Sequence, residues 1–396
     1  MTVPFAGLFD PARHEPLCGD PWDSARVRLA IEAIAADAIR AQEAGRWPRH
    51  PLDGDAPVHA RSLYYGSAGV LWALALLARA GAIPNEPRLP EWAAALPDGA
   101  LSDPDQRDAR ESYFVGAAGV LLVALRECGD QRFDEALYEL LTGHLDHPAR
   151  EAFLGSAGAM VAAVFAFELT SDERWRSLFR IAAENLIAAW ERHPADRFDL
   201  WTQDLYGAKR RLLGASHGFA GNLHALHRGW ELLDESQRLA IAPRAEAALV
   251  ATAIRYGELA SWPIAAGGST CLVHWCHGAP GVLTSFRRAP SRRLVDEALL
   301  HGAELIWRAG PLRKGPNLCH GVAGNGEALL ALYSRTGDEL WLDRARRFAM
   351  HGIRQVEAVR ARYGRGRYSL WTGDLGVAVY LWQCIDGTSG MPSLDL

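Results

Sequence analysis

The sequence predicts an all-α protein that folds as an α/α toroid, a double α-barrel with seven inner and seven outer helices. Two observations lead to this prediction. A pair of glycines three residues apart, followed by an alanine-rich apolar run, occurs seven times along the chain. Segments between these runs carry apolar residues at helical spacing among charges. The copies begin at Gly66, Gly116, Gly155, Gly218, Gly278, Gly321 and Gly373.

The run after each glycine pair predicts a buried inner helix. VLWALALLA after Gly69 and AMVAAVFAF after Gly158 are apolar nearly all round, as helices that are buried on both sides are. The copies recur at intervals of 39 to 63 residues. Each interval has room for the inner helix, one further helix and two loops.

Amphipathic outer helices are expected between the runs, at 24–42, 174–190, 292–308 and 338–360. Few segments show the strict alternation with β-branched residues that predicts strands, which disfavours the sheet-based folds. We therefore expect one domain over 1–396, with an N-terminal extension at 1–23 and the repeats at about 63–384.

Composition and charge exclude several classes of protein. With 42 Lys and Arg against 47 Asp and Glu, the net charge is −5, so the chain lacks the basic character of a nucleic-acid binder. No basic segment followed by an apolar run opens the chain, and no stretch of about 18 apolar residues follows. We expect a cytoplasmic protein without a membrane span. Six cysteines are too few for a disulfide scaffold in a chain without an export signal.

The repeats differ in the two residues that precede the first glycine. Four copies place mainly aromatic or aliphatic residues there, which we interpret as structural fillers; Tyr64-Tyr65 is an example. The fourth, fifth and sixth copies instead hold Ser216-His217, Cys276-His277 and Cys319-His320. If the repeats are structurally equivalent, these side chains converge on one mouth of the barrel.

That convergence predicts a metal site. Zinc takes cysteine and histidine ligands, and a catalytic zinc keeps three protein ligands and one open position. Cys276, Cys319 and His320 supply such a set. His217 and His277 remain as candidates for acid/base chemistry or for supporting the ligands.

Three motifs at these positions resemble the LanC family, the lanthionine synthetase C proteins and their LanC-like relatives. They are GASHGFAG at 214–221, HWCHGAPG at 274–281 and LCHGVAG at 318–324. The resemblance extends through all seven repeats and implies a toroid with seven inner helices. It also implies a zinc ion held by Cys276, Cys319 and His320, with His217 as a catalytic acid/base.

Members of this family join a thiol to dehydroalanine or dehydrobutyrine and form a thioether. The peptide cyclases do so within one precursor peptide, whereas the LanC-like branch is associated with glutathione. Where the cyclases carry an arginine and a tyrosine around the first zinc cysteine, this chain has Leu272 and His277. It has Glu151 in place of their aspartate before the third repeat. We take Glu151, His217 and His277 as the catalytic candidates.

The segments HWCHGAPG, KGPNLCHG and RYSLW are similar to sequences of the LanC-like branch. The resemblance therefore implies a zinc-dependent enzyme that adds a thiol such as glutathione to dehydroamino acids of a peptide or protein. Lys314 and Arg367 would be partners for the glutathione carboxylates. Few residues precede the first repeat, so the dehydrated residues are expected to come from a separate protein or from phosphate elimination.

Four alternatives remain open at this point. The chain could be a lanthipeptide cyclase that forms intramolecular lanthionine rings, or a non-catalytic zinc scaffold that binds modified peptides. The G-x-S-x-G pattern at 214–218 also occurs in serine hydrolases, where it needs a parallel sheet. Toroidal glycosidases use two carboxylates, for which Glu151, Glu327 or Asp374 would be candidates.

Overall fold

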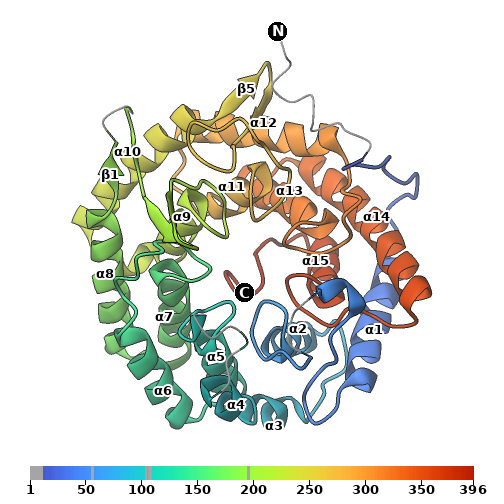
Figure 1. Ribbon diagram of the computed structural model, residues 1–396. Coiled ribbons are helices and arrows are strands. Elements are labelled where there is room, and N and C mark those ends of the chain that lie inside the picture. The colour runs from blue at the N-terminus through green and yellow to red at the C-terminus, as the bar shows by residue number, and fades with distance from the viewer. Residues whose placement is uncertain (1–11, 55–57, 103–104, 106–108, 194–196) are drawn as a thin grey trace.

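The structure, a computed structural model, describes residues 12–54, 58–102, 105, 109–193 and 197–396. These residues form two concentric rings of helices (Figure 1), which confirms the predicted α/α toroid. The helices of the inner ring are α2 (Ser67–Arg79), α5 (Ala117–Cys128), α7 (Ser156–Thr170), α9 (Phe219–Arg228), α11 (Ala279–Ser285), α13 (Val322–Thr336) and α15 (Asp374–Asp386).

The outer ring alternates with the inner one along the chain. It consists of α1 (Ser24–Ala41), α3 (Leu89–Ala94), α6 (Gln131–Thr142), α8 (Glu173–Ala188), α10 (Glu235–Thr252), α12 (Arg293–Ala309) and α14 (Glu339–Tyr363), with the short α4 (Pro97–Ser102) beside α3. The four outer helices with predicted ranges, α1, α8, α12 and α14, begin and end within three residues of those ranges. The ring closes where α15 packs against α1 and α2.

Aspartates begin most of the outer helices. In five of them the side chain of the preceding aspartate accepts a hydrogen bond from a backbone amide of the first turn, which satisfies a group that otherwise lacks a partner. These caps are Asp23, Asp130, Asp172, Asp234 and Asp338.

Three two-stranded antiparallel hairpins decorate the rings among the described residues, and sequence analysis missed them. They pair β1 (Glu191–Arg192) with β2 (Asp199–Leu200), β3 (Gln203–Leu205) with β4 (Ala208–Arg210), and β5 (Ile254–Tyr256) with β6 (Leu259–Ser261). All three lie in the connections that lead into α9 and α11. Strands this short carry no readable alternation.

The repeated glycines allow a loop to cross the first turn of each inner helix. At the second glycine of every copy, a Cβ atom would lie only 1.9 to 2.4 Å from the carbonyl oxygen of the residue six positions earlier. A side chain there would collide with backbone, which cannot move aside cheaply. The seven positions are Gly69, Gly119, Gly158, Gly221, Gly281, Gly324 and Gly376.

The same loops are joined to one another by backbone hydrogen bonds around one mouth of the toroid. In six of the seven copies, the residue two positions before the first glycine donates its amide to the carbonyl of its equivalent in the next repeat around the ring, at 2.9 to 3.4 Å. These links connect Phe153 to Ser216, Ser216 to Cys276, Cys276 to Cys319, Cys319 to Trp371, Trp371 to Tyr64 and Tyr64 to Phe114. The Ser112 hydroxyl closes the circuit by donating to the Phe153 carbonyl at 2.6 Å. We call these seven linked residues the mouth ring.

No helix in the described part of the chain is long and apolar enough to cross a bilayer.

The glycine repeat makes a direct prediction about stability. Replacing Gly119 by alanine should lower the free energy of unfolding by about 2 to 4 kcal/mol, because the new Cβ would lie 2.2 Å from the Tyr113 carbonyl oxygen. The matched control is Gly352→Ala in α14, where no atom lies within 4 Å of the added Cβ; this change should stabilise by up to about 1 kcal/mol. Chemical denaturation measures both. Equal effects of the two substitutions would contradict this role of the repeat.

A buried carboxyl on α13 predicts how stability varies with pH. Burial raises the pKa of Glu327 from 4.5 to about 8, so the folded state holds a proton that the unfolded state releases. The free energy of unfolding should therefore fall, by at most about 1.4 kcal/mol per pH unit, as pH rises between these values. Glu327→Gln should remove this component, so its stability relative to wild type should rise from pH 5 to pH 8.

The control for that pH series is Glu304→Gln in α12. Hydrogen bonds from arginines hold the pKa of Glu304 below its ordinary value despite burial. The contribution of Glu304 to the free energy of unfolding therefore changes only at acid pH. The difference between Glu304→Gln and wild type should stay constant from pH 5 to pH 8. A flat difference for Glu327→Gln as well would show that Glu327 is ionised in the folded protein.

Candidate metal centre

The three predicted ligands come together at the mouth ring. Cys276 and Cys319 are adjacent ring members, and His320 follows Cys319 directly. Their ligand atoms all lie within 4.8 Å of one another. Cys319 is buried, whereas Cys276 and His320 are half-buried. Two sulfur atoms and one imidazole nitrogen at this spacing suit a tetrahedral zinc ion with one position left open.

The Cys319 thiol has polar partners on several sides. Hydrogen bonds from the Cys276 thiol, the His320 ring and the Tyr64 hydroxyl lower its pKa well below the ordinary value, although burial opposes them. The Tyr64 hydroxyl lies 3.0 Å from the Cys319 sulfur. Tyr64 is therefore more than the aromatic filler that the sequence suggested, since its hydroxyl directly contacts a candidate ligand. No pattern in the sequence pairs a first-repeat aromatic residue with a sixth-repeat cysteine.

A histidine and a carboxylate lie beside this cluster. His217 follows the ring member Ser216, and its Nδ1 atom lies 3.0 Å from an Oε atom of Glu151. Glu151 is fully buried and accepts a further hydrogen bond, 2.7 Å long, from the Phe153 amide. The carboxylate is thus fixed on its own loop, and by engaging Nδ1 it orients the His217 ring and leaves Nε2 for another partner.

His277 lies close to His217, with ring centroids 6.3 Å apart. Burial, and the charge of His217 after it, lower the pKa of His277 to about 4. Near neutral pH His277 is uncharged, so its ring suits accepting or positioning a hydrogen bond rather than donating a proton as a cation. Sequence analysis missed His274, whose ring lies 6.2 Å from that of His320 and whose pKa burial lowers to about 3.

The two predicted carboxylate-binding residues differ in their surroundings. Lys314 is exposed on the loop before Cys319, and its charge acts on the pKa of both His274 and Cys276. Arg367 already has partners in the chain: its Nε donates to Asp53 at 2.6 Å and its guanidinium also donates to the Leu52 carbonyl. Of the two, Lys314 is the cation free to approach from solvent.

An exposed aromatic residue flanks the cluster. Tyr206 occupies the turn between β3 and β4 with φ of +53° and is 79% exposed, and its ring lies 6.2 Å from that of His217. Because sequence analysis did not predict this hairpin, it could not place Tyr206 at the site.

Two of the open alternatives lose their structural basis. The carboxyl groups of Glu327 and Asp374 are buried in separate places: Glu327 accepts from Ser389 and Gly390, and Asp374 accepts from the Arg367 amide. Neither shares a hydrogen-bond partner with Glu151, which contacts His217 and the Phe153 amide, so the contacts give no sign of a paired glycosidase site. Ser216 follows no strand of a parallel sheet, since the sheets of the described residues are all antiparallel pairs, so it does not form a hydrolase elbow.

The fold and the cluster together define a toroidal protein with a cysteine and histidine site at one mouth. The family model for lanthionine synthetase C-like proteins matches residues 57–396, and the chain belongs to this family. The resemblance seen in the three motifs is thereby confirmed.

Individual proteins agree with this assignment. The chain is 31% identical to glutathione S-transferase LANCL1 of Danio rerio over 192 residues. This matched stretch covers 46% of this chain and 43% of the relative. It is 37% identical to LanC-like protein GCL1 of Arabidopsis thaliana over 118 residues. This stretch covers 28% of this chain and 27% of that relative. The matched stretches thus span less than half of either relative. Nisin cyclase has the same fold, with a TM-score of 0.62 and 16% identity over 94% of this chain and 98% of that structure.

The donor set predicts the metal content of the purified protein. Elemental mass spectrometry should find about one zinc per chain in wild type and none in a Cys276→Ala/Cys319→Ala double variant. The matched control is Cys18→Ala/Cys128→Ala, which removes two half-buried free cysteines outside the mouth ring and should keep the metal. A well-folded wild type without zinc, even after reconstitution, would contradict the assignment.

Proposed function

We propose that this protein is a zinc-dependent enzyme that adds an external thiol, such as glutathione, to dehydroalanine or dehydrobutyrine residues of peptides or proteins. The product is a thioether. The observation that carries the proposal is the meeting of the Cys276, Cys319 and His320 donors within 4.8 Å beside the pair formed by His217 and Glu151.

A zinc ion bound by these donors would supply a Lewis acid with one open position, where a thiol loses its proton near neutral pH. The side chains of the chain supply the rest. Cys319 is only 3% exposed, so the surrounding residues limit the access of water to its sulfur. Two thiolate ligands offset the charge of a divalent ion, which favours a nucleophilic bound sulfur.

His217 is placed to move the proton that the reaction requires. Glu151 holds Nδ1, so Nε2 can take the proton released by the thiol. The sulfur attacks the β-carbon of the dehydroamino acid, and the electron pair of the carbon–carbon double bond moves towards the α-carbon. His217 then returns the proton to the α-carbon, which balances the addition.

An external thiol is favoured over ring closure by the cation beside the site. Lys314 is exposed next to the Cys319 loop, where it suits a carboxylate of a small thiol. The Danio rerio relative is a glutathione S-transferase by name. Tyr206 offers an exposed ring against which the peptide substrate can pack.

The proposal predicts different consequences for the ligand and the acid/base residue. His217→Ala should keep zinc and lose about 10²- to 10⁴-fold in turnover, whereas Cys319→Ala should lose both zinc and turnover. His301→Ala, a half-buried histidine on the outer helix α12, is the control and should keep both. The assay is mass spectrometry of a dehydroalanine peptide incubated with glutathione and the zinc-loaded protein. Full activity in His217→Ala or Cys319→Ala would contradict the roles given to these residues.

The same assay separates the two alternatives that remain. A substrate with both dehydroalanine and a free cysteine that closes into a ring without taking up glutathione would identify a cyclase. Saturable peptide binding without any thioether would identify a zinc scaffold. The proposed activity requires a glutathione adduct on a peptide that has no cysteine of its own.

A further inference from the structure

The segment 388–396 turns back from α15 into the centre of the toroid. In Figure 1 the C-terminal end of the chain lies within the outline of the inner ring. Met391 and Ser393 are completely buried, and Leu394 is 3% exposed. A segment without regular structure that occupies the lumen needs polar partners for its backbone and side chains.

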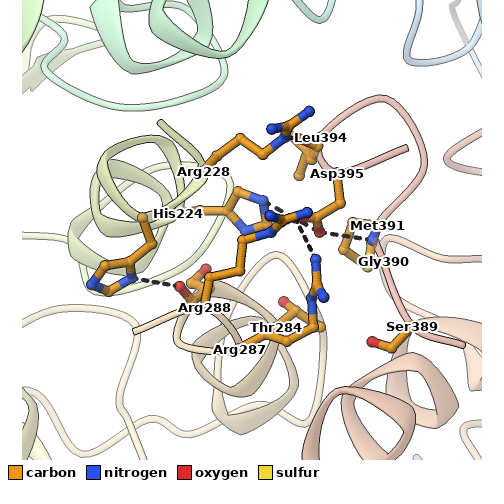
Figure 2. Close-up of polar contacts among 12 residues, drawn as sticks. His224, Arg228, Thr284, Arg287, Arg288, Ser389, Gly390, Met391, Leu394 and Asp395 are labelled. Carbon is orange, nitrogen blue, oxygen red and sulfur yellow. Dashed lines mark hydrogen bonds and ion pairs between the residues drawn. The ribbon is translucent and has the colours of Figure 1, made fainter. Parts of the chain in front are cut away.

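Asp395 is the main anchor of this segment (Figure 2). Its carboxylate lies 2.9 Å from a guanidinium nitrogen of Arg287, 3.4 Å from one of Arg288 and 3.5 Å from Nε2 of His224. It also accepts the Met391 amide at 2.9 Å. Although burial acts in the opposite direction, these charges hold the pKa of Asp395 far below its ordinary value. Asp395 is therefore ionised and fully paired.

Other inner-ring residues hold the segment along its length. Glu327 on α13 accepts the Ser389 hydroxyl and the Gly390 amide, at 3.0 and 2.7 Å. Arg228 at the end of α9 donates to the Leu394 carbonyl at 3.2 Å, and Trp72 on α2 donates to the Leu396 carbonyl at 2.9 Å. The partners thus come from three different inner helices.

The polar partners make this arrangement specific to the segment. Of the buried polar residues, His224 on α9 and Glu327 on α13 lie where 388–396 passes, and Arg287 follows α11. An unpaired charge inside a protein is costly. The segment supplies a polar partner to each of these three residues, so we infer that the lumen is built to hold it.

The segment also reaches the candidate metal centre through one side chain. The Ser393 hydroxyl oxygen lies 3.2 Å from Nε1 of Trp371 and accepts its hydrogen bond. Trp371 is a member of the mouth ring, and its carbonyl accepts the Cys319 amide at 3.0 Å. Its indole lies against that of Trp275, with ring centroids 4.3 Å apart. A series of contacts therefore links the segment, through Trp371, to the proposed zinc ligand Cys319.

We propose that 388–396 is an internal plug that closes the lumen beneath the metal centre and positions Trp371 and Cys319, with Asp395 as its anchor. Asp395 and Ser393 are positioning residues, since they act through Trp371 and touch no reacting atom. The part of this inference that concerns the metal rests on the proposed function, whereas the structural part does not.

The test compares Asp395→Asn with Glu304→Gln, a control that removes a carboxylate paired with two arginines on the outer helices. Hydrogen exchange of the metal-free proteins is followed by mass spectrometry in peptides that cover 388–396, Cys319 and Trp371. The rate of Co²⁺ release is measured separately, by absorption. In Asp395→Asn we expect exchange in all three regions, and Co²⁺ release, to accelerate about tenfold or more, with no change in the control.

Two results would overturn the proposal. Unchanged exchange at 388–396 in Asp395→Asn would show that Asp395 is not the anchor. Faster exchange there without any change at Cys319 and Trp371 would show that the segment does not position the site. If wild type fails to bind Co²⁺, the proposed function is wrong, yet the exchange data still decide whether the plug exists.

Ser393→Ala guards against a failure of Asp395→Asn to fold. It removes only the acceptor of the Trp371 hydrogen bond and leaves the ion pairs of Asp395 in place. Exchange at Trp371 and Cys319 should accelerate several-fold while 388–396 stays protected. Unchanged exchange at both residues would contradict the link from the plug to the mouth ring.

Discussion

The mouth ring is the constraint on which the rest of the structure depends. Seven residues from seven repeats are joined by backbone hydrogen bonds, with the Ser112 hydroxyl completing the circuit. The bonds fix the height and rotation of each loop relative to its neighbours. Because each loop must also cross the first turn of its own inner helix, the second glycine of each copy cannot carry a Cβ. The glycine repeat in the sequence is therefore a consequence of the loop geometry that the mouth ring requires.

The ring divides the mouth into two arcs with different chemistry. Ser216, Cys276 and Cys319 form a polar arc, and the other four members are aromatic. The aromatic rings pack on one another at centroid distances of 5.0 to 6.4 Å, which leaves a water-poor wall opposite the thiols. Tyr64 belongs to this wall and still reaches the Cys319 sulfur. The ligands therefore lie in a medium where each hydrogen bond to sulfur has a larger effect on reactivity.

The features that sequence analysis predicted are those that repeat. Seven glycine pairs predicted seven inner helices, and the 3.6-residue period located α1 and α8 closely. Departures from the repeat predicted the cluster of Cys276, Cys319 and His320, and the resemblance singled out both Glu151 and His217. The hairpins were missed because two or three residues carry no period. The path of 388–396 was missed because its partners lie far away in sequence, so that only the folded ring brings Asp395 to Arg287.

The mouth ring also determines what a metal ion would contribute. Both backbone groups of Cys276 and of Cys319 are engaged within the ring, and the His320 amide donates to Asn317 at 3.0 Å. The ligand loops are thus held before any ion arrives, in contrast to small zinc domains whose ligands come together only with the metal. Binding of a metal ion would therefore not be needed to fold these loops. The position that three protein donors leave open would then be the one available to an exchanging fourth ligand.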